Sequence, residues 1–170
     1  MTDEIRAAIE RAGGYLTEHP DEARYTDSVA TARLRDALHV EVTGPQGERI
    51  EADMPAGVGG LGKAPGPGWL LRASVAACVS SLAGMRAAQV GLSGFTCEVE
   101  VDSESDDRGI LGLDTEVPAG PLGMRIGIRL AADGADAGQL ADIAAWAVEH
   151  CPTADAVQRA IPIRMEVDAG

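Results

Sequence analysis

Two cysteines stand in settings that could support thiol chemistry. Cys78 lies in "SVAACVSSLAG", an apolar, alanine-rich run, and Cys151 directly precedes Pro152 in "EHCPTADAV". A free cysteine is among the most buried residue types and packs like a small hydrophobe, which is the favoured interpretation of Cys78 considered alone. Cys151 is expected at the N-terminus of a short helix, where unpaired N–H groups stabilise a thiolate. The sequence therefore leaves two interpretations open, a pair of packing residues and a reactive pair.

The remaining candidate ligands and nucleophiles give weaker signals. Cys97 lies between Phe95 and Val99 on the apolar side of an expected strand, which favours a role as core filler. His150 adjoins Cys151, but the chain has no C-x-x-C or H-x-x-x-H spacing, so we predict no metal site.

Charge and composition restrict the partners that the protein can have. The chain has 170 residues with 14 Lys and Arg against 27 Asp and Glu, a formal net charge of −13. Nucleic acids and anionic membrane surfaces are bound by positive faces, so neither is an expected partner. The first residues, "MTDEIRAAIERAGG", contain acids and no continuous apolar segment, so we expect no signal peptide and a cytoplasmic protein with reduced thiols.

The elements that must position the cysteines follow from hydrophobic periodicity. An N-terminal helix over residues 3–18 and a polar linker are expected to form an extension, residues 1–27, to a domain over residues 28–170. The expected elements of that domain, in order, are strands within 30–43 and 48–54, a central helix over 69–90, a strand over 95–104, an acidic loop over 102–114, a strand over 124–130, helices over 137–151 and 152–160, and a final strand over 161–169.

This order of elements predicts an α+β fold. The central helix is apolar on nearly all sides, and Arg72, Arg86, Gln89 and three serines make it a poor membrane span. One small sheet covers only one side of such a helix. A second copy of the chain is the expected cover, so the sequence predicts a homodimer.

The chain resembles the OsmC/Ohr family of osmotically inducible and organic hydroperoxide resistance proteins. The resemblance rests on "GPGWLLRASVAACVSS", which leads into the central helix, and on "HCPTADAVQRAIPIRMEV" at the end of the chain. It covers residues 28–167. The fold that it implies is an intertwined homodimer in which antiparallel sheets from both chains enclose two long central helices.

The resemblance also implies a cysteine-based peroxidase. In that role Cys78 is the peroxidatic thiol, which an organic hydroperoxide oxidises to a sulfenic acid. Cys151 is the resolving thiol, which forms a disulfide with it, and an external dithiol then reduces the disulfide without any bound cofactor. The family uses an arginine of an early strand to activate the thiolate; Arg33 and Arg35 are the candidates, with Arg72 as a third, and Arg35 is the residue we select.

One departure from the family pattern supports an alternative function. Active hydroperoxide reductases of the family carry a glutamate after the loop proline, ten residues before the first cysteine, and this chain has Gly68 there. Trp69 follows it. The sequence therefore predicts a peroxidase acting on organic hydroperoxides, and alternatively a non-catalytic dimer that binds a small apolar ligand in a pocket at its interface.

Overall fold

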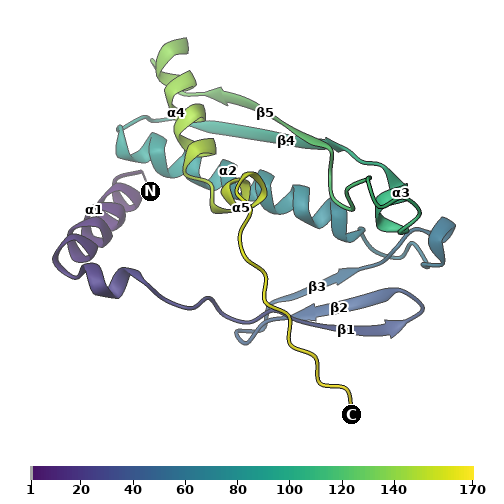
Figure 1. The fold of residues 1–170 in the computed structure, drawn as a ribbon. Helices are drawn as coiled ribbons and strands as arrows, with labels where there is room; N and C mark the ends of the chain where they lie inside the picture. Colours follow the sequence, from purple (N-terminus) through teal and green to yellow (C-terminus); the bar gives the residue numbers. More distant parts are fainter. Residues whose placement is uncertain (1) are drawn as a thin grey trace.

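The fold is built around one long helix, α2 (Pro67–Gln89), in a computed structural model that describes residues 2–170 (Figure 1). Gly66 is its N-cap residue and Pro67 occupies the first turn, where a missing N–H costs no hydrogen bond. The preceding loop is held close to the body because Gly60 has no side chain: a Cβ there would lie 1.7 Å from the Met54 carbonyl oxygen. This loop sets the point at which α2 begins.

Two antiparallel sheets accompany α2 and lie above and below it in Figure 1. The three-stranded sheet, in the order β1-β2-β3, consists of β1 (Thr31–Asp36), β2 (His39–Thr43) and β3 (Arg49–Ala52). The two-stranded sheet consists of β4 (Thr96–Glu104) and β5 (Gly123–Ala131), which pair along their whole length. Strands β4 and β5 alternate between half-buried and exposed side chains, as expected for a sheet with one face on a core.

The other helices pack around α2. Helix α1 (Thr2–Glu18) lies against it, followed by a 3-10 turn at Pro20–Ala23, and α4 (Ala137–Glu149) crosses it with α5 (Pro152–Gln158) close to the crossing (Figure 1). A second 3-10 turn, Ala56–Val58, precedes α2, and α3 (Asp107–Ile110) follows β4. The start of α4 is fixed by a capping box in which Asp136 and Gln139 each accept the other's backbone N–H.

The core lies where α2, α4 and α5 meet the inner face of β4 and β5. Small aliphatic side chains dominate it, which allows the helices to approach one another closely. Its fully buried members are Val75, Val79, Ala83, Ala87, Ile143, Ala147, Cys151 and Ala154. Both cysteines of interest belong to this region, since Cys78 packs against the same cluster.

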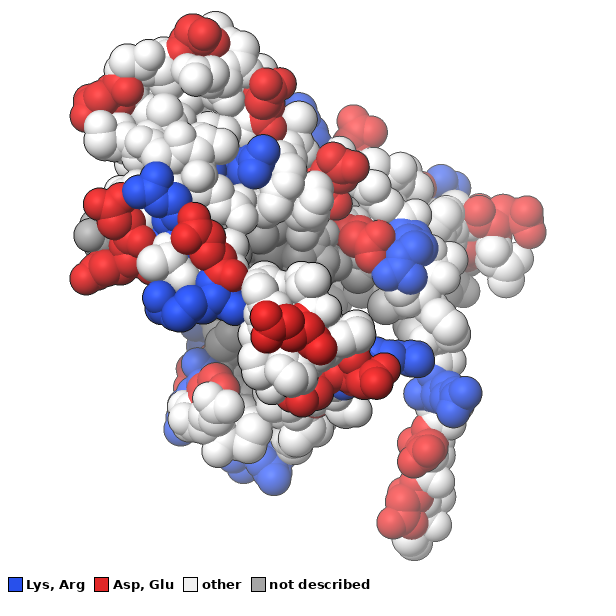
Figure 2. All heavy atoms as spheres, turned by 90° about the vertical axis from the view of Figure 1, so that its left-hand side faces the viewer, with Lys and Arg blue, Asp and Glu red and all other residues white. Residues whose placement is uncertain are grey.

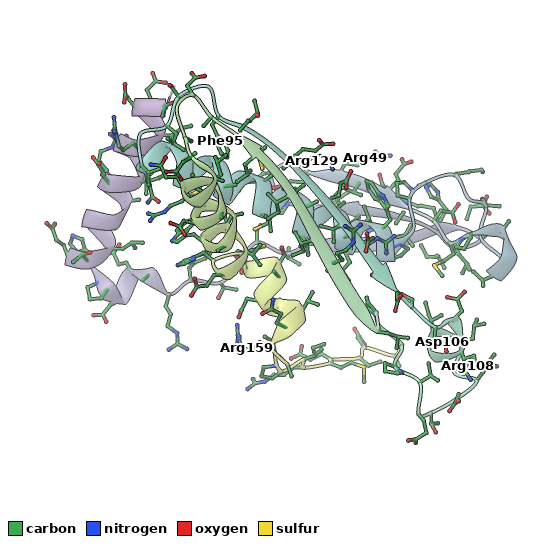
Figure 3. All side chains as sticks on the ribbon, turned by 90° about the horizontal axis from the view of Figure 1, so that it is seen from above. Arg49, Phe95, Asp106, Arg108, Arg129 and Arg159 are labelled. Atoms are coloured by element: carbon green, nitrogen blue, oxygen red, sulfur yellow. The ribbon has the colours of Figure 1, made fainter. Side chains whose placement is uncertain are left out.

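The strand predicted over residues 95–104 is confirmed as β4, so the acidic loop predicted over 102–114 begins only after residue 104 and contains the short helix α3. Residues 102–104 extend β4, because Asp102 lies opposite Arg125 of β5 and forms an ion pair with it. Asp106 then caps α3 by accepting the Arg108 N–H at 3.0 Å, and the two side chains also meet (Figure 3). Asp102 and Asp106 therefore have structural partners, one across the strands and one at a helix N-terminus.

The predicted final strand, residues 161–169, is not a strand in the single chain. The segment runs away from the body as an extended tail (Figure 1), and Ile163 and Met165 are 90% and 85% exposed. Its alternating apolar pattern is present, but no strand pairs with it in the part of the chain that the structure describes. A strand forms its backbone hydrogen bonds with a neighbouring strand, and the hydrophobic periodicity of a segment does not show whether such a neighbour is present.

The expectation that the central helix is buried on all sides is also not met by one chain. Val75, Val79, Ala83, Ala87 and Ala88 are its buried residues. Ser74, Ala77, Ser81 and Met85, on another stripe, are exposed. By length and composition α2 could cross a membrane, a property that core helices of soluble proteins share.

Charged side chains cover much of the surface without forming a basic face in the view of Figure 2. Basic and acidic residues are interspersed there, and the C-terminal tail projects from the body. On the outer face of β4 and β5, Arg129 bridges Glu98 and Glu100 at 3.1 and 2.7 Å; Figure 3 labels this arginine. These ion pairs neutralise the positive charge of Arg129 on this face of the sheet.

Candidate active site: two thiols in contact

Helix α2 places Cys78 at the edge of the core. Val75 and Val79, on the adjoining positions of the helix, are completely buried, whereas Cys78 is only partly buried. The Cys78 thiol therefore lies at the boundary between the packed interior and the solvent-reachable surface. This position combines desolvation with access, which a reactive thiol requires.

The junction of α4 and α5 places Cys151. Helix α4 ends at Glu149, Pro152 starts α5, and Cys151 between them is the N-cap residue, with no exposed surface. Its Sγ accepts a hydrogen bond from the Ala154 N–H at 3.4 Å and lies 3.1 Å from the Thr153 hydroxyl oxygen. The sulfur thus takes the capping role that an oxygen of Ser, Thr or Asp usually fills.

The two thiols, far apart in sequence, are close enough in the fold for each to shift the pKa of the other. Both are free cysteines in this structure. Hydrophobic periodicity does not specify that α5 docks beside Cys78, whereas the family resemblance implies that the two cysteines approach each other.

The surroundings push the two thiol pKa values apart. Burial, and the hydrogen bond with Cys151, raise the pKa of Cys78. Burial also acts to raise the pKa of Cys151, but the hydrogen bonds from Thr153, Ala154 and Cys78 outweigh it and leave that pKa below its ordinary value. Cys151 is therefore the thiol of the pair that ionises more readily.

Acidity and accessibility therefore favour different members of the pair. Cys151 is the more acidic thiol but is sealed, and Cys78 is the less acidic thiol but is reachable. The proximity of the two thiols reconciles these properties, because a proton moved from Cys78 to the Cys151 thiolate would transfer the negative charge to the accessible sulfur. The arrangement suits a nucleophile whose partner stores the proton.

Thr153 is the residue of this site that sequence reasoning missed. Its hydroxyl contacts Cys151, and both its side chain and its backbone act on Cys78. The available signal was its place two residues after Cys151, in the first turn of a helix that Pro152 begins. A hydroxyl there can reach the N-cap side chain.

The structure places the selected arginine outside the thiol pair. Arg35 belongs to β1 and donates to Glu41 of β2, with Nε 2.9 Å from the carboxylate oxygen. Glu41 is 9% exposed and also pairs with Arg49 at 2.8 Å. Because of the Arg35 hydrogen bond, the pKa of Glu41 lies below its ordinary range. Arg35 thus already has an anionic partner within the chain.

The other two arginine candidates are also engaged elsewhere or distant from the sulfurs in the fold. Arg33 lies opposite Glu41 on the same sheet as Arg35. Arg72, although on α2, donates to the Ser103 hydroxyl of β4 at 3.2 Å. Neither arginine is among the groups that chiefly set the thiol pKa values; those groups are the two cysteines, Thr153 and Ala154.

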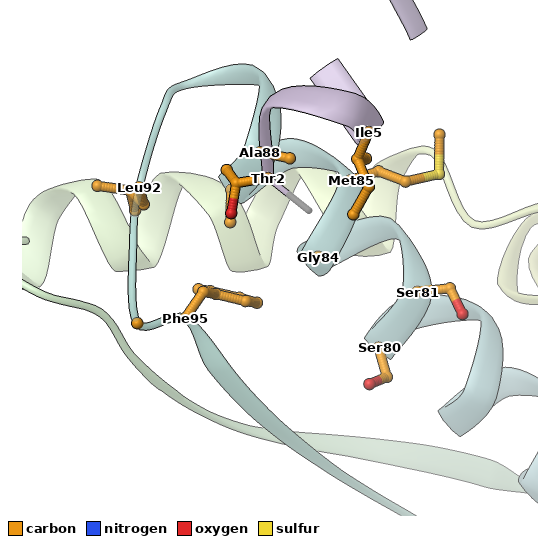
Figure 4. Close-up of a pocket in the computed structure, with 11 residues that line it drawn as sticks. Thr2, Ile5, Ser80, Ser81, Gly84, Met85, Ala88, Leu92 and Phe95 are labelled. Carbon is orange, nitrogen blue, oxygen red and sulfur yellow. The ribbon is translucent and has the colours of Figure 1, made fainter. Parts of the chain in front are cut away.

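Two cavities of similar size lie near the ends of α2. One, about 510 Å³, is formed where α1 crosses α2 and is lined by Ile5, Ser81, Met85 and Phe95 among others (Figure 4). The other, about 540 Å³, lies at the start of α2. Its lining includes Gly68, Trp69 and Arg72, so Trp69 does lie at a pocket wall. Neither cysteine lines either cavity.

The family model described as OsmC-like protein matches residues 60–166, which include the central helix and both cysteines of the pair. The chain belongs to the OsmC-like protein family. No curated protein is significantly similar to this OsmC-like protein.

Solved structures share the fold of this OsmC-like protein at low sequence identity. An OsmC-like protein from Mycoplasma pneumoniae has a TM-score of 0.67 at 16% identity, covering 81% of this chain and 91% of its own. An organic hydroperoxide resistance protein from Elizabethkingia anophelis has a TM-score of 0.56 at 19% identity, covering 79% and 90%. A Legionella pneumophila protein of the same description, named OsmC, has a TM-score of 0.53 at 22% identity, covering 79% and 91%.

Within residues 2–170, no group of three or more His, Cys, Asp or Glu side chains is arranged to hold a metal ion. His150, next to Cys151 in sequence, is stacked on the Trp146 ring, with 4.2 Å between the ring centroids. Its Nδ1 lies 2.8 Å from the Trp146 carbonyl oxygen.

Proposed function

We propose that this OsmC-like protein is a thiol-dependent peroxidase that reduces organic hydroperoxides. The observation that carries the proposal is the direct contact between Cys78 and Cys151, one reachable and one sealed. Solved structures of the same fold include proteins named for organic hydroperoxide resistance, which supports the choice of oxidant.

The proposed reaction begins at Cys78. Its proton passes to Cys151, and the Cys78 thiolate attacks the terminal oxygen of R–O–OH. The O–O bond breaks, Cys78 becomes a sulfenic acid, and the leaving alkoxide takes the proton from Cys151 to become the alcohol, which leaves Cys151 as a thiolate. The sulfur is oxidised by two electrons and the hydroperoxide is reduced by two.

Cys151 completes the proposed cycle. Its thiolate attacks the Cys78 sulfur, the S–OH bond breaks, and hydroxide leaves as water after protonation. An external dithiol then reduces the disulfide by exchange, returning both thiols and leaving with its own disulfide. No bound cofactor enters this cycle.

The test is oxidation of the reduced protein by cumene hydroperoxide, followed by counting free thiols and mapping disulfides. We expect one alcohol per Cys78–Cys151 disulfide in the parent, a stable sulfenic acid in Cys151→Ser, and no peroxide consumption in Cys78→Ser. Cys97→Ser, whose side chain packs elsewhere on the core, is the matched control and should behave like the parent. If Cys78 and Cys151 stay reduced under excess hydroperoxide, the proposal is wrong.

We further propose that the working molecule is an intertwined homodimer whose sheets enclose both copies of α2. Two features of the single chain support this: the exposed stripe of α2 and the exposed apolar tail. The β1–β3 sheet also leaves Leu34 and Ile50 more than half exposed. Apolar surface of this extent on one chain marks an interface.

A second candidate function is favoured by the cavity at the start of α2. Gly68 and Trp69 line a space of about 540 Å³, which is the size of a small-molecule pocket. A non-catalytic dimer would bind an apolar ligand there. A thermal-shift screen of small apolar compounds against the parent and Trp69→Ala tests it. Compounds that stabilise the parent but not the variant, with unoxidised thiols in the peroxide assay, would favour this function.

A further inference from the structure

The Cys78–Cys151 pair has a third member. We propose that Thr153 is a positioning residue whose hydroxyl holds the negative charge of the thiol pair, by donating a hydrogen bond to Cys151 and reaching Cys78 as well. The proposal rests on the proposed function for its catalytic meaning, but its test detects the thiolate directly and requires no peroxide.

The geometry supports donation by this hydroxyl. Thr153 Oγ1 lies 3.1 Å from Cys151 Sγ, and the Ala154 N–H reaches the same sulfur at 3.4 Å. Once Cys151 is ionised, its sulfur has no proton, so the Thr153 hydroxyl has to be the donor in their contact. Two donors then converge on a sulfur that has no exposed surface and receives no hydrogen bond from water.

Thr153 also links the two sulfurs. Its side chain and its backbone both form hydrogen bonds that favour the ionised form of Cys78. When the proton moves from Cys78 to Cys151, the hydroxyl can rotate and follow the charge. A single rotating hydroxyl donor would stabilise the negative charge on either sulfur. It would therefore lower the energy needed to move that charge from Cys151 to Cys78.

The nearest charged groups are occupied elsewhere. Asp155 of α5 pairs with Arg159 at 2.5 Å, and His150 at the end of α4 stacks on Trp146. On α2, Arg72 bonds Ser103, and Arg86 lies over the Trp146 ring, 5.4 Å from its centroid. Strands β4 and β5 turn apolar side chains and Cys97 toward this core. Within one chain, neutral hydrogen-bond donors therefore stabilise the Cys151 thiolate.

The test compares Thr153→Val with Thr153→Ser in a Cys97→Ser background. Valine keeps the shape and removes the hydroxyl, whereas serine keeps the hydroxyl and removes a methyl group. The backbone donors of Thr153 and Ala154 remain in both. Thiolate formation is followed by ultraviolet absorbance against pH, and by the pH profile of alkylation of the reachable thiol.

We expect Thr153→Val to raise the lower apparent pKa of the thiol pair by about one pH unit, which is about a tenfold loss of thiolate below that pKa. Thr153→Ser should titrate like its background. Equal titration of all three proteins, or an equal rise in both variants, would overturn the proposal.

Two further measurements separate an effect on the thiol pKa from misfolding and from a failure of the proposed peroxidase function. Thermal unfolding and sedimentation check that the variants are folded alike, and if Thr153→Val does not fold, Thr153→Ala replaces it with the same expectation. Peroxide consumption is measured separately in the same proteins. Parent thiols that resist peroxide but show the Thr153-dependent titration would disprove the peroxidase and leave this inference standing.

Discussion

At the scale of single residues, the site separates two properties that a reactive cysteine is expected to combine. Cys151 has the hydrogen bonds and Cys78 has the access. A lone thiol at the Cys78 position would be a poor nucleophile, because burial raises its pKa. Contact with a more acidic thiol provides a place for its proton. The two thiols therefore titrate as a coupled pair, and the apparent pKa values describe the pair and not the single residues.

Arg35 remains our proposed activating arginine, and its effect is testable at the same scale. Within one chain Arg35 is hydrogen-bonded to Glu41, so we propose that it approaches a thiol of the second copy in the proposed dimer. We expect Arg35→Gln to slow oxidation of Cys78 by hydroperoxide about tenfold, since a nearby cation lowers a thiol pKa by a unit or more. The rate is measured by stopped-flow loss of thiol.

Arg33→Gln is the matched control for Arg35, because Arg33 lies two residues away on the same strand. It should oxidise at the parent rate. If Arg33→Gln slows Cys78 oxidation and Arg35→Gln does not, Arg33 is the activating arginine. If both variants oxidise at the parent rate, neither arginine of β1 activates the thiol.

At the scale of elements, the crossing of α2 by α4 decides whether the two thiols meet. Ile143 of α4 is 3% exposed and belongs to the cluster that contains Val75, Val79 and Cys151. Helix α4 leads directly into Cys151, so its packing sets the position of the α5 N-terminus. Small residues on α2, including Ala83 and Ala87, allow the close approach.

Truncation of Ile143 tests this packing. We expect Ile143→Ala to lower the free energy of unfolding by about 2–4 kcal/mol, through lost burial and a residual cavity. Ile110→Ala, at a side chain that is 57% exposed, should change it by no more than about 0.5 kcal/mol. Urea unfolding of both at one protein concentration provides the comparison. A cost for Ile143→Ala no larger than that of the control would show that α4 is not anchored there.

At the scale of the whole molecule, the single chain leaves its C-terminal tail without a partner. Ile163, Met165 and Val167 alternate with polar residues and are at least 74% exposed. An extended apolar segment with an unpaired backbone is not stabilised in water and tends to pair with other chains, which promotes aggregation. Pairing with a sheet edge of a second copy would bury one face of the tail and complete its hydrogen bonds.

The tail predicts how the dimer can be broken. We expect the parent to sediment at twice the chain mass, and the double variant Ile163→Asp, Met165→Asp to dissociate or to unfold at much lower temperature, because charges would be buried in the interface. Arg164→Asp, at the intervening position, is the control and should stay dimeric. A parent that sediments as a single chain would contradict the proposed dimer.

Local patterns in the sequence predicted most elements correctly. Helix α2 at Pro67–Gln89, strands β4 and β5, and helix α5 after Pro152 all lie where periodicity and the proline indicated. Each of these depends on the residues of its own segment. Two predictions overlapped at residues 102–104, and the strand is the correct one, because Asp102 lies opposite Arg125 of β5.

The sequence by itself determined which segments are helices and strands, because hydrophobic period and capping act within a few residues. It also supplied both thiols and the proline that places Cys151 at a helix start. Only the tertiary structure decided that the two thiols touch, that Thr153 joins them, and that Arg35 binds Glu41. Contacts of this kind depend on how whole elements pack, and packing is fixed by the sum of many weak interactions that no single motif encodes.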